Sequence, residues 1–249
     1  MAVLLRRRHN GVVQLRSTES PILIGKSAAR VFCVTREDGV QWIEKSGPAA
    51  ELMLEAGVMR WCAGRLPVPE VLAIEAGLLS MSALPGVNLT EASIDCAVAL
   101  TAEALHLIHS VPAEGCPFQA DWATRLHQAE HRVKNGLVEQ SDFDEVNLGR
   151  SAVDILAELQ AQPPLPPLSC FTHGDACLPN FLTRGGLLTG IVDLGRAGVA
   201  HPAQDWALAL RSMRDNFGSD GERLLRKQLP QHCADEALLR RFRLLDELF

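Results

Sequence analysis

The sequence predicts an α+β protein in which a small, strand-rich lobe precedes a larger, mainly helical lobe. Short apolar runs alternate with turn residues through the first third, apolar residues then recur at helical spacing, and Pro85-Gly86 separates the two regions. The chain has 249 residues, 47% of them hydrophobic, which is enough to bury a substantial core. We therefore expect an N-terminal lobe over residues 1–82, a hinge over 83–86 and a C-terminal lobe over 87–249.

The expected N-terminal lobe contains strands and one helix. Residues 21–35 and 39–45 combine β-branched and aromatic residues with flanking turn signals, so they predict strands. Residues 48–64 are rich in Ala, Leu, Glu and Met and begin with a proline, which is typical of a helix. Residues 66–86 predict two further strands separated by a turn at Gly77.

The expected C-terminal lobe is mostly helical. Apolar residues at helical spacing predict helices at residues 90–111, 121–133 and 151–160. Residues 162–169 are rich in proline and predict a rigid connector. Residues 169–195 have the pattern of strand, loop, strand, turn and strand, and the rest of the chain is expected to be helical.

Charge and composition exclude several classes of protein. Thirty acidic residues against 24 Lys and Arg give a formal charge of −6, which argues against general nucleic-acid binding. No apolar run approaches the roughly 20 residues that span a bilayer, and the N-terminal apolar stretch precedes its charges, the reverse of a secretory signal. We therefore expect a cytoplasmic protein with no nucleic-acid or membrane partner. Seven scattered cysteines without C-x-x-C spacing predict free thiols.

The segments THGDACLPNF and GIVDLGR carry the most informative pattern. Asp175 and Asn180 are five positions apart, and Asp193 follows thirteen positions later. Phosphoryl transfer needs a carboxylate to hold the attacking hydroxyl and oxygen ligands to hold Mg²⁺ on the phosphates. The kinase motifs H-R-D-x-x-x-x-N and D-F-G have this order and spacing. Each motif alone is also a common polar turn, but together they favour a kinase-type base and Mg²⁺ site.

A kinase also needs a lysine that holds the nucleotide phosphates and a helix glutamate that pairs with it. Lys45 ends an expected strand, and Glu55 lies in the helix that follows. The turn that contains Gly25 and Ser27 follows an expected strand and is a candidate cover for the phosphates, although G-x-G-x-x-G is absent. These positions predict ATP as the cofactor.

The chain resembles the aminoglycoside 3'-phosphotransferases, which are bacterial antibiotic kinases with a protein-kinase-like fold. The resemblance extends from about Ile22 to Phe249 and is carried by IGKSAARVF, WCAGRLPVPEVL, GLVEQSDFDE, THGDACLPNF, IVDLGRAGVA, DWALALRSMRD and LLDELF. It implies a bilobal fold with a small antiparallel sheet and a larger helical lobe. It also implies ATP-dependent phosphorylation of an aminoglycoside such as kanamycin, at the 3'-hydroxyl, with antibiotic resistance as the consequence.

The same resemblance implies a set of site residues. Asp175 is then the catalytic aspartate, with Asn180 and Asp193 as Mg²⁺ ligands. Lys45, paired with Glu55, holds the α- and β-phosphates, and the backbone from Ser82 to Leu84 binds adenine. Substrate recognition falls on Asp142, Asp144, Glu145, Arg211, Asp215, Asp246, Glu247 and the Phe249 α-carboxylate.

The acidic positions fit this substrate on physical grounds as well. Residues 142–145 hold three carboxylates, and LLDELF adds two. Carboxylates form charge-assisted hydrogen bonds with ammonium groups, which an aminoglycoside carries in number. Several positions depart from the family. Glu44 precedes Lys45 where an apolar residue is more usual, Ile43 stands where some relatives stack an aromatic on adenine, and Asp215 and Asn216 replace a more acidic pair.

Other interpretations stay open. A kinase for another small hydroxyl compound, such as a choline-like molecule, a sugar or a macrolide, would share the loops but not the acidic positions. An inactive nucleotide-binding relative would lack turnover. A protein kinase is disfavoured because Asp205 follows Asp193 by only twelve positions and no A-P-E motif follows. Asp205 is either an anchor of the catalytic loop or a helix N-cap, and Arg196 faces either phosphate or a carboxylate. We expect a monomer or weak dimer.

Overall fold

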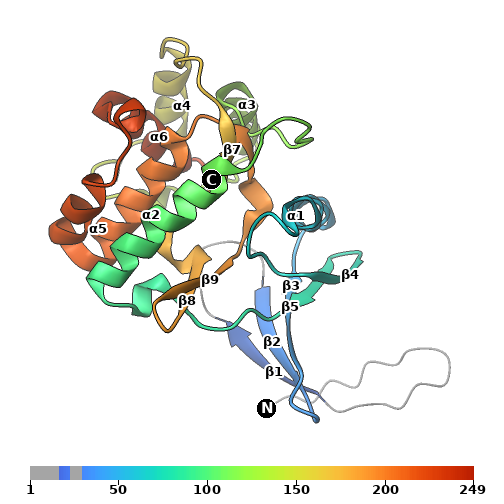
Figure 1. The fold of residues 1–249 in the computed structure, drawn as a ribbon. Coiled ribbons are helices and arrows are strands. Elements are labelled where there is room, and N and C mark those ends of the chain that lie inside the picture. Colours follow the sequence, from blue (N-terminus) through green and yellow to red (C-terminus); the bar gives the residue numbers. More distant parts are fainter. Residues whose placement is uncertain (1–16, 23–29) are drawn as a thin grey trace.

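A computed structural model describes residues 17–22 and 30–249. The N-terminal part forms one five-stranded antiparallel sheet with the order β1-β2-β3-β5-β4, and a single helix packs beside it (Figure 1). These elements are β1 (Ser17–Ile22), β2 (Arg30–Arg36), β3 (Gln41–Ser46), α1 (Ala49–Cys62), β4 (Val71–Glu75) and β5 (Leu78–Ser82). The expected helix and the strands β2 to β5 are therefore present, whereas β1 begins before the stretch that was expected to form strands, and residues 23–29 of that stretch lie outside the described residues.

The register of the central strands determines which side chains face α1. In β3, Lys45 is buried and lies opposite Val31 of β2 and Leu79 of β5. Strand residues alternate between the two faces of a sheet, so Glu44 lies on the other face, where it accepts a hydrogen bond from the Trp42 indole (3.2 Å). The alternation thus directs the lysine toward the helix.

Helix α1 begins directly after Pro48 and buries one face against the sheet and the helical lobe. Leu52, Glu55, Ala56 and Met59 recur at helical spacing on that face and are almost fully buried. Glu55 is therefore the polar member of an otherwise apolar stripe, which is a costly position for a carboxylate without a partner.

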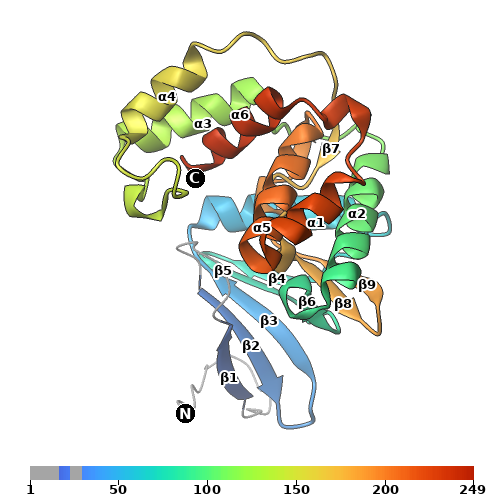
Figure 2. The ribbon, with the colours of Figure 1, turned by 90° about the vertical axis from the view of Figure 1, so that its left-hand side faces the viewer.

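The C-terminal part contains five α-helices: α5 packs on α2 and α6, and α3 and α4 pack on each other and on α6 (Figures 1 and 2). Four of the five begin at a Ser or Asp N-cap whose side chain accepts a backbone N–H. Helix α5 is interrupted at Gly218, where φ is +67°. The helices are α2 (Ile94–Ser110), α3 (Trp122–Lys134), α4 (Ala152–Gln160), α5 (Ala203–Arg226) and α6 (Glu236–Asp246).

Short strands within the helical lobe position the functional loops. Strands β6 (Val87–Asn88), β8 (Phe181–Arg184) and β9 (Leu187–Ile191) form one antiparallel sheet, and β7 (Cys170–Thr172) pairs with β10 (Gly198–Ala200). The sequence patterns predicted β7, β8 and β9 but missed β6 and β10, because two or three residues are too few to show an alternation. Their pairing brings the Asp175 and Asp193 loops next to each other.

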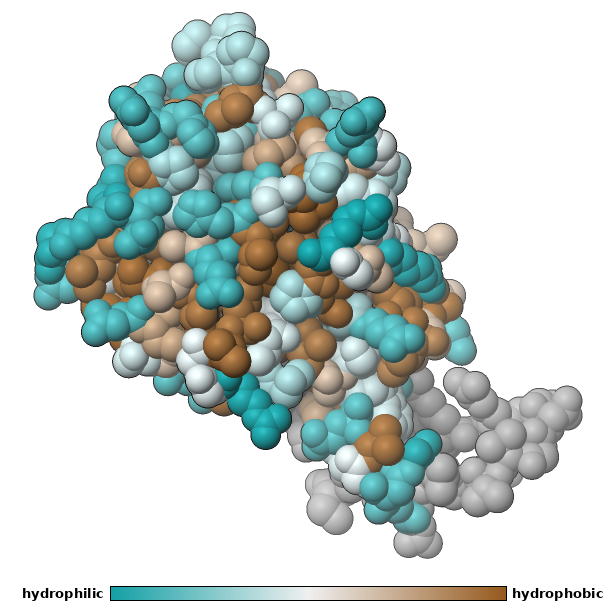
Figure 3. All heavy atoms as spheres, viewed as in Figure 1, coloured by the Kyte–Doolittle hydropathy of each residue, from teal (hydrophilic) through white to brown (hydrophobic). Residues whose placement is uncertain are grey.

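The structure confirms the expected fold class, which is a small antiparallel-sheet lobe followed by a larger helical lobe. All seven cysteines are free, as predicted. No helix among the described residues is long and apolar enough to cross a membrane. Figure 3 shows hydrophilic side chains interspersed with apolar ones over one face of the molecule.

Candidate active site

The Asp175 loop is held by a buried carboxylate at the start of α5. Asp205 is fully buried and accepts hydrogen bonds from the backbone N–H groups of His173 (2.8 Å) and Gly174 (2.9 Å) and from His109 Nε2 (3.0 Å). Pro202 occupies the N-cap position of α5. The anchor interpretation of Asp205 is therefore correct and the N-cap interpretation is wrong.

The charged form of Asp205 is stabilised by its surroundings. Burial alone would raise the pKa of this carboxyl, but the hydrogen bond and charge of His109, with His173 and its backbone N–H, hold the pKa below its usual range. The carboxylate therefore stays ionised while it fixes the backbone that precedes Asp175.

Asn180 lies on the next turn and is oriented by the Asp175 loop itself. Its side-chain Nδ2 donates to the main-chain carbonyl oxygen of Asp175 (2.9 Å), and the main-chain carbonyl oxygen of Asn180 accepts from Val192 N (2.9 Å). The second bond ties this turn to the residue just before Asp193. Because the amide nitrogen is used by the protein, the side-chain oxygen Oδ1 is the group left to act as a ligand.

Asp193 joins the two lobes through Lys45. Lys45 Nζ lies 2.8 Å from Asp193 Oδ1 and 2.9 Å from Glu55 Oε2. Asp193 has a left-handed backbone, with φ of +60° and ψ of +57°, and is the single non-glycine residue with positive φ among the described residues. Such a conformation is costly outside glycine, so the turn is held in place by its neighbours.

Burial and charge act in opposite directions on these three groups. Burial alone would lower the pKa of Lys45, but Asp193 and Glu55 outweigh it and raise the pKa. Burial would raise the pKa of Asp193, and Lys45 brings it below its usual value. Burial keeps the pKa of Glu55 raised despite Lys45. The ammonium group and the Asp193 carboxylate are thus both held in their charged forms.

The donor set fits a divalent cation of the hard type. Asn180 Oδ1 and the second Asp193 oxygen are the oxygen ligands that Mg²⁺ prefers, and such a site in kinases takes few protein ligands and completes its shell with phosphate and water. The Asp193 side chain is 43% exposed, so part of its carboxylate is open to solvent.

The segment that joins the lobes begins at the end of β5. Ser82 N donates to Glu70 O (2.9 Å), and Ser82 Oγ accepts from Glu70 N (2.8 Å). Ile43 lies opposite Met81 of β5 and is half-buried. Leu84 packs closely on Gly190: a Cβ added at Gly190 would lie 2.7 Å from the Leu84 side chain. Gly25 and Ser27, the predicted phosphate-covering turn, lie outside the described residues.

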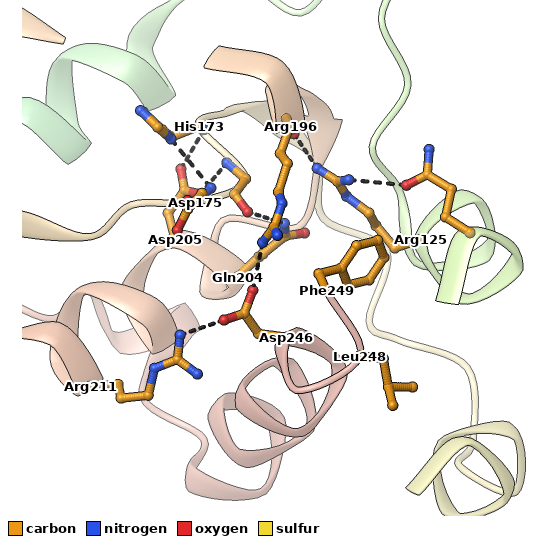
Figure 4. A network of polar contacts seen from close by, with 12 residues as sticks. Arg125, His173, Asp175, Arg196, Gln204, Asp205, Arg211, Asp246, Leu248 and Phe249 are labelled. Atoms are coloured by element: carbon orange, nitrogen blue, oxygen red, sulfur yellow. Dashed lines mark hydrogen bonds and ion pairs between the residues drawn. The ribbon is translucent and has the colours of Figure 1, made fainter. Parts of the chain in front are cut away.

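Asp246 is paired with two arginines (Figure 4). Arg196 Nη1 lies 2.9 Å from Asp246 Oδ1, and Arg211 pairs with the other oxygen. Burial would raise the pKa of Asp246, but the two guanidinium groups hold it below its usual range. Arg211 also lies 3.8 Å from Asp144. Arg196 therefore faces a carboxylate, and the α6 end is tied to both the Asp193 turn and α5.

Glu247 braces the loop that follows α3. Its carboxylate accepts from Asp144 N (3.0 Å) and from Asn147 Nδ2 (2.7 Å). Burial raises the pKa of Glu247 in spite of these bonds. Glu247 and Asp144 are both predicted to bind the substrate, and Glu247 holds Asp144 close to the end of α6.

The other predicted acidic residues lie at the surface. Asp142 and Glu145 are exposed on the segment between α3 and α4. Asp215 is exposed on α5, with Arg214 at 3.7 Å. The structure places the α3–α4 segment, the α6 end and Arg211 in one region, whereas Asp215 lies about one helical turn further along α5 than Arg211.

The sequence did not single out two arginines of α3 that contact the last residue. Arg132 donates to the Leu248 carbonyl oxygen (2.7 Å) and to the Phe249 main-chain oxygen (2.9 Å). Its guanidinium and those of Arg125 and Arg196 lie 5.7, 5.6 and 5.1 Å from the centre of the Phe249 ring. No motif marked them, because a helical arginine in a charged helix is ordinarily a solvated residue.

Comparison with known proteins gives one consistent family. The sequence matches the phosphotransferase enzyme family over residues 18–245. It is 33% identical over 238 residues to an aminoglycoside 3'-phosphotransferase of Niallia circulans, covering 91% of this chain and 90% of that one. The crystal structure of a type VIII aminoglycoside-3'-phosphotransferase has a TM-score of 0.79 at 28% identity and covers 93% of this chain and 94% of its own.

A second solved relative contains ligands. It is an aminoglycoside phosphotransferase of Streptomyces rimosus in complex with ADP and streptomycin, with a TM-score of 0.76, 25% identity and 92% coverage of each chain. These similarities extend over nearly the whole chain, and the matched range of residues 18–245 contains both loops described above. The chain therefore belongs to the phosphotransferase enzyme family and, within it, to the aminoglycoside 3'-phosphotransferases.

Proposed function

We propose that this chain transfers the γ-phosphoryl group of ATP to a hydroxyl group of an aminoglycoside, the 3'-hydroxyl of a kanamycin-type drug, and so confers resistance. One observation carries the proposal: Asp175 and Asn180 share a turn that is hydrogen-bonded to the Asp193 turn, and Asp193 contacts the Lys45–Glu55 pair. This is the arrangement that phosphoryl transfer needs.

Asp175 would orient the sugar hydroxyl and accept its proton late in the transfer. Carboxylates are weak bases, so most of the rate enhancement is expected from positioning. The anchored backbone at His173 and Gly174 supports that role, because it fixes the direction from which the Asp175 side chain leaves the loop.

Lys45 would bind the α- and β-phosphates, with Glu55 holding it in place. An ammonium group has three N–H donors, and two are used by Glu55 and Asp193, which leaves one for a phosphate oxygen. Asn180 and Asp193 would hold Mg²⁺, which neutralises phosphate charge when bound. The backbone of residues 82–84 would bind adenine, and Ser82 N is already bonded to Glu70.

The acidic positions would bind the ammonium groups of the substrate. Asp142, Asp144 and Glu145 come from the α3–α4 segment, Asp246, Glu247 and the Phe249 α-carboxylate from the chain end, and Asp215 from α5. Arg211, also on α5, is a cation and would serve the site by positioning Asp144 and Asp246. Asp144 is braced by Glu247 and Arg211, which supports a preformed site. Residues 1–82 and 87–249 would act as the nucleotide and substrate lobes around a hinge at 83–86. The cytoplasmic location and the monomeric or weakly dimeric state also remain predictions.

The test is product analysis. Purified protein is incubated with ATP, Mg²⁺ and kanamycin, ADP release is followed by a coupled assay, and the product is examined by mass spectrometry and NMR. We expect one added phosphate on the 3'-oxygen. ADP release with a choline-like compound, a sugar or a macrolide but not with kanamycin or neomycin would refute the substrate class, and binding of ATP without any turnover would indicate an inactive relative.

A further inference from the structure

Arg125 is a buried cation whose hydrogen-bond partners are neutral. It lies on α3, is 7% exposed, and donates to Gln128 Oε1 (3.0 Å) and to the Arg196 carbonyl oxygen. Burial, followed by the charge of Arg196, lowers the pKa of Arg125 to about 10. A buried guanidinium without a carboxylate in direct contact weakens the folded state, so its position calls for a role other than stability.

The Arg125 guanidinium touches the backbone that carries Asp175. Gly174 has φ of +81°, and a Cβ at this position would come 2.8 Å from Arg125 Nη2 and closer still to the Arg196 carbonyl oxygen. The catalytic loop thus packs its bare backbone directly on these two groups. Any side chain here would push the loop away from α3.

Three supports converge on Gly174 (Figure 4). Asp205 accepts its N–H, Gln204 Nε2 donates to its carbonyl oxygen (3.2 Å), and Arg125 holds the Arg196 carbonyl against its Cα. Arg125, Gly174, Arg196 and Gln204 also line one small cavity together with Phe249 and Asp246. Asp205 and Gln204 belong to α5, so Arg125 is the support that comes from the other side of the loop.

We propose that Arg125 is a positioning residue for phosphoryl transfer, which clamps the Gly174–Asp175 backbone to the Leu194–Arg196 turn. The proposal rests on the proposed kinase function. By fixing the carbonyl of Arg196, Arg125 keeps the two turns at a constant separation, and these turns carry the hydroxyl-orienting carboxylate of Asp175 and the cation ligand Asp193. Loss of the clamp should affect the chemical step more than nucleotide binding, because the Lys45–Glu55 ion pair does not involve the clamped turn, and only the contact of Lys45 with Asp193 lies next to it.

The test compares Arg125→Met with Lys134→Met. Methionine fills a similar volume without charge, so the fold should be retained, with an unchanged or raised Tm. Lys134 is an exposed residue at the end of the same helix and serves as the matched control. We expect kcat of Arg125→Met to fall about 10- to 100-fold, with KM for ATP changed less than about twofold. In Arg125→Ala, added methylguanidinium should restore part of kcat, whereas it should not help Asp175→Asn.

Hydrogen exchange gives a readout that does not depend on turnover. The peptide that contains residues 173–176 should exchange faster in Arg125→Met than in the parent or in Lys134→Met, while peptides of α3 should not. Unchanged exchange in this peptide, or unchanged kcat in an active parent, would overturn the clamp. If the parent phosphorylates no aminoglycoside but Arg125→Met still exchanges faster than the parent at residues 173–176, the proposed function is refuted and the clamp stands.

Discussion

Asp205→Asn tests whether the Asp175 loop depends on a buried carboxylate. In the parent chain one carboxylate oxygen accepts from both His173 N and His109 Nε2, and the other accepts from Gly174 N. An asparagine side chain has one oxygen. The asparagine oxygen can keep the hydrogen bonds from His173 N and His109 Nε2 by taking the place of the carboxylate oxygen that accepts both. The NH₂ group of the asparagine then faces the Gly174 N–H.

The structure gives the size of the effect. One charge-assisted hydrogen bond is lost and two donors face each other in a site without solvent, which costs about 2–4 kcal/mol. For a chain of this length, that loss lowers Tm by about 5–15 °C. The freed Gly174 N–H also loosens the Asp175 loop, so kcat should fall at least about tenfold.

Stability should be measured by thermal and urea unfolding across a pH series, with Asp220→Asn as the control. Asp220 is an exposed residue of the same helix, and its change should lie within about 0.5 kcal/mol. The pKa of Asp205 is lowered in the folded chain by His109 and His173, so its stabilisation is complete above the unfolded value of about 3.9 and is lost as pH falls through the folded pKa.

The difference between parent and Asp205→Asn should therefore be constant near neutral pH and shrink below about pH 4. An unchanged Tm at neutral pH, or a difference that grows on acidification, would show that the carboxylate does not hold the loop. A lower Tm with an unchanged kcat would show that Asp205 stabilises the fold without fixing the Asp175 loop for catalysis, which would contradict the expected fall in kcat.

Three further changes test the site. Asp175→Asn should lower kcat about 10²- to 10⁴-fold with ATP affinity retained in titration calorimetry, and wild-type turnover would contradict its role. Gly174→Ala places a side chain against the Arg196 carbonyl at φ of +81° and should cost about 2 kcal/mol or more in urea unfolding; an equally stable variant would refute this packing. Glu247→Gln weakens the brace on Asp144 and should raise KM for the aminoglycoside by up to about tenfold, with KM for ATP as the internal control.

The sequence predicted the parts of the site whose spacing is dictated by chemistry. Order and separation predict the roles of Asp175, Asn180 and Asp193, and a place on a strand and on the next helix predicts those of Lys45 and Glu55; the structure brings the predicted residues together. Phosphoryl transfer restricts these residue types and their spacing along the chain, so the pattern can be recognised from the sequence alone. The confirmed helices likewise follow from periodicity and N-cap residues that act within a few positions.

The sequence could not predict the contacts that hold these parts in place. Arg125 reaches a backbone carbonyl 71 positions away, and Arg132 reaches the Leu248 carbonyl 116 positions away. A main-chain acceptor leaves no trace in residue types, because every residue has a carbonyl. For the same reason the LLDELF carboxylates were assigned to substrate alone, although Glu247 accepts from Asp144 N.

The distribution of charge explains why the two lobes meet at Lys45. One ammonium group lies between the carboxylates of Glu55 and Asp193, so this cluster has a net charge near −1 when all three groups are ionised. A negative cluster repels a triphosphate and attracts a divalent cation. In the proposed function, a cation held by Asp193 would offset this negative charge and allow Lys45 to hold the phosphates. The Asp175 loop, fixed by its buried anchor, would then present its carboxylate from a defined backbone position.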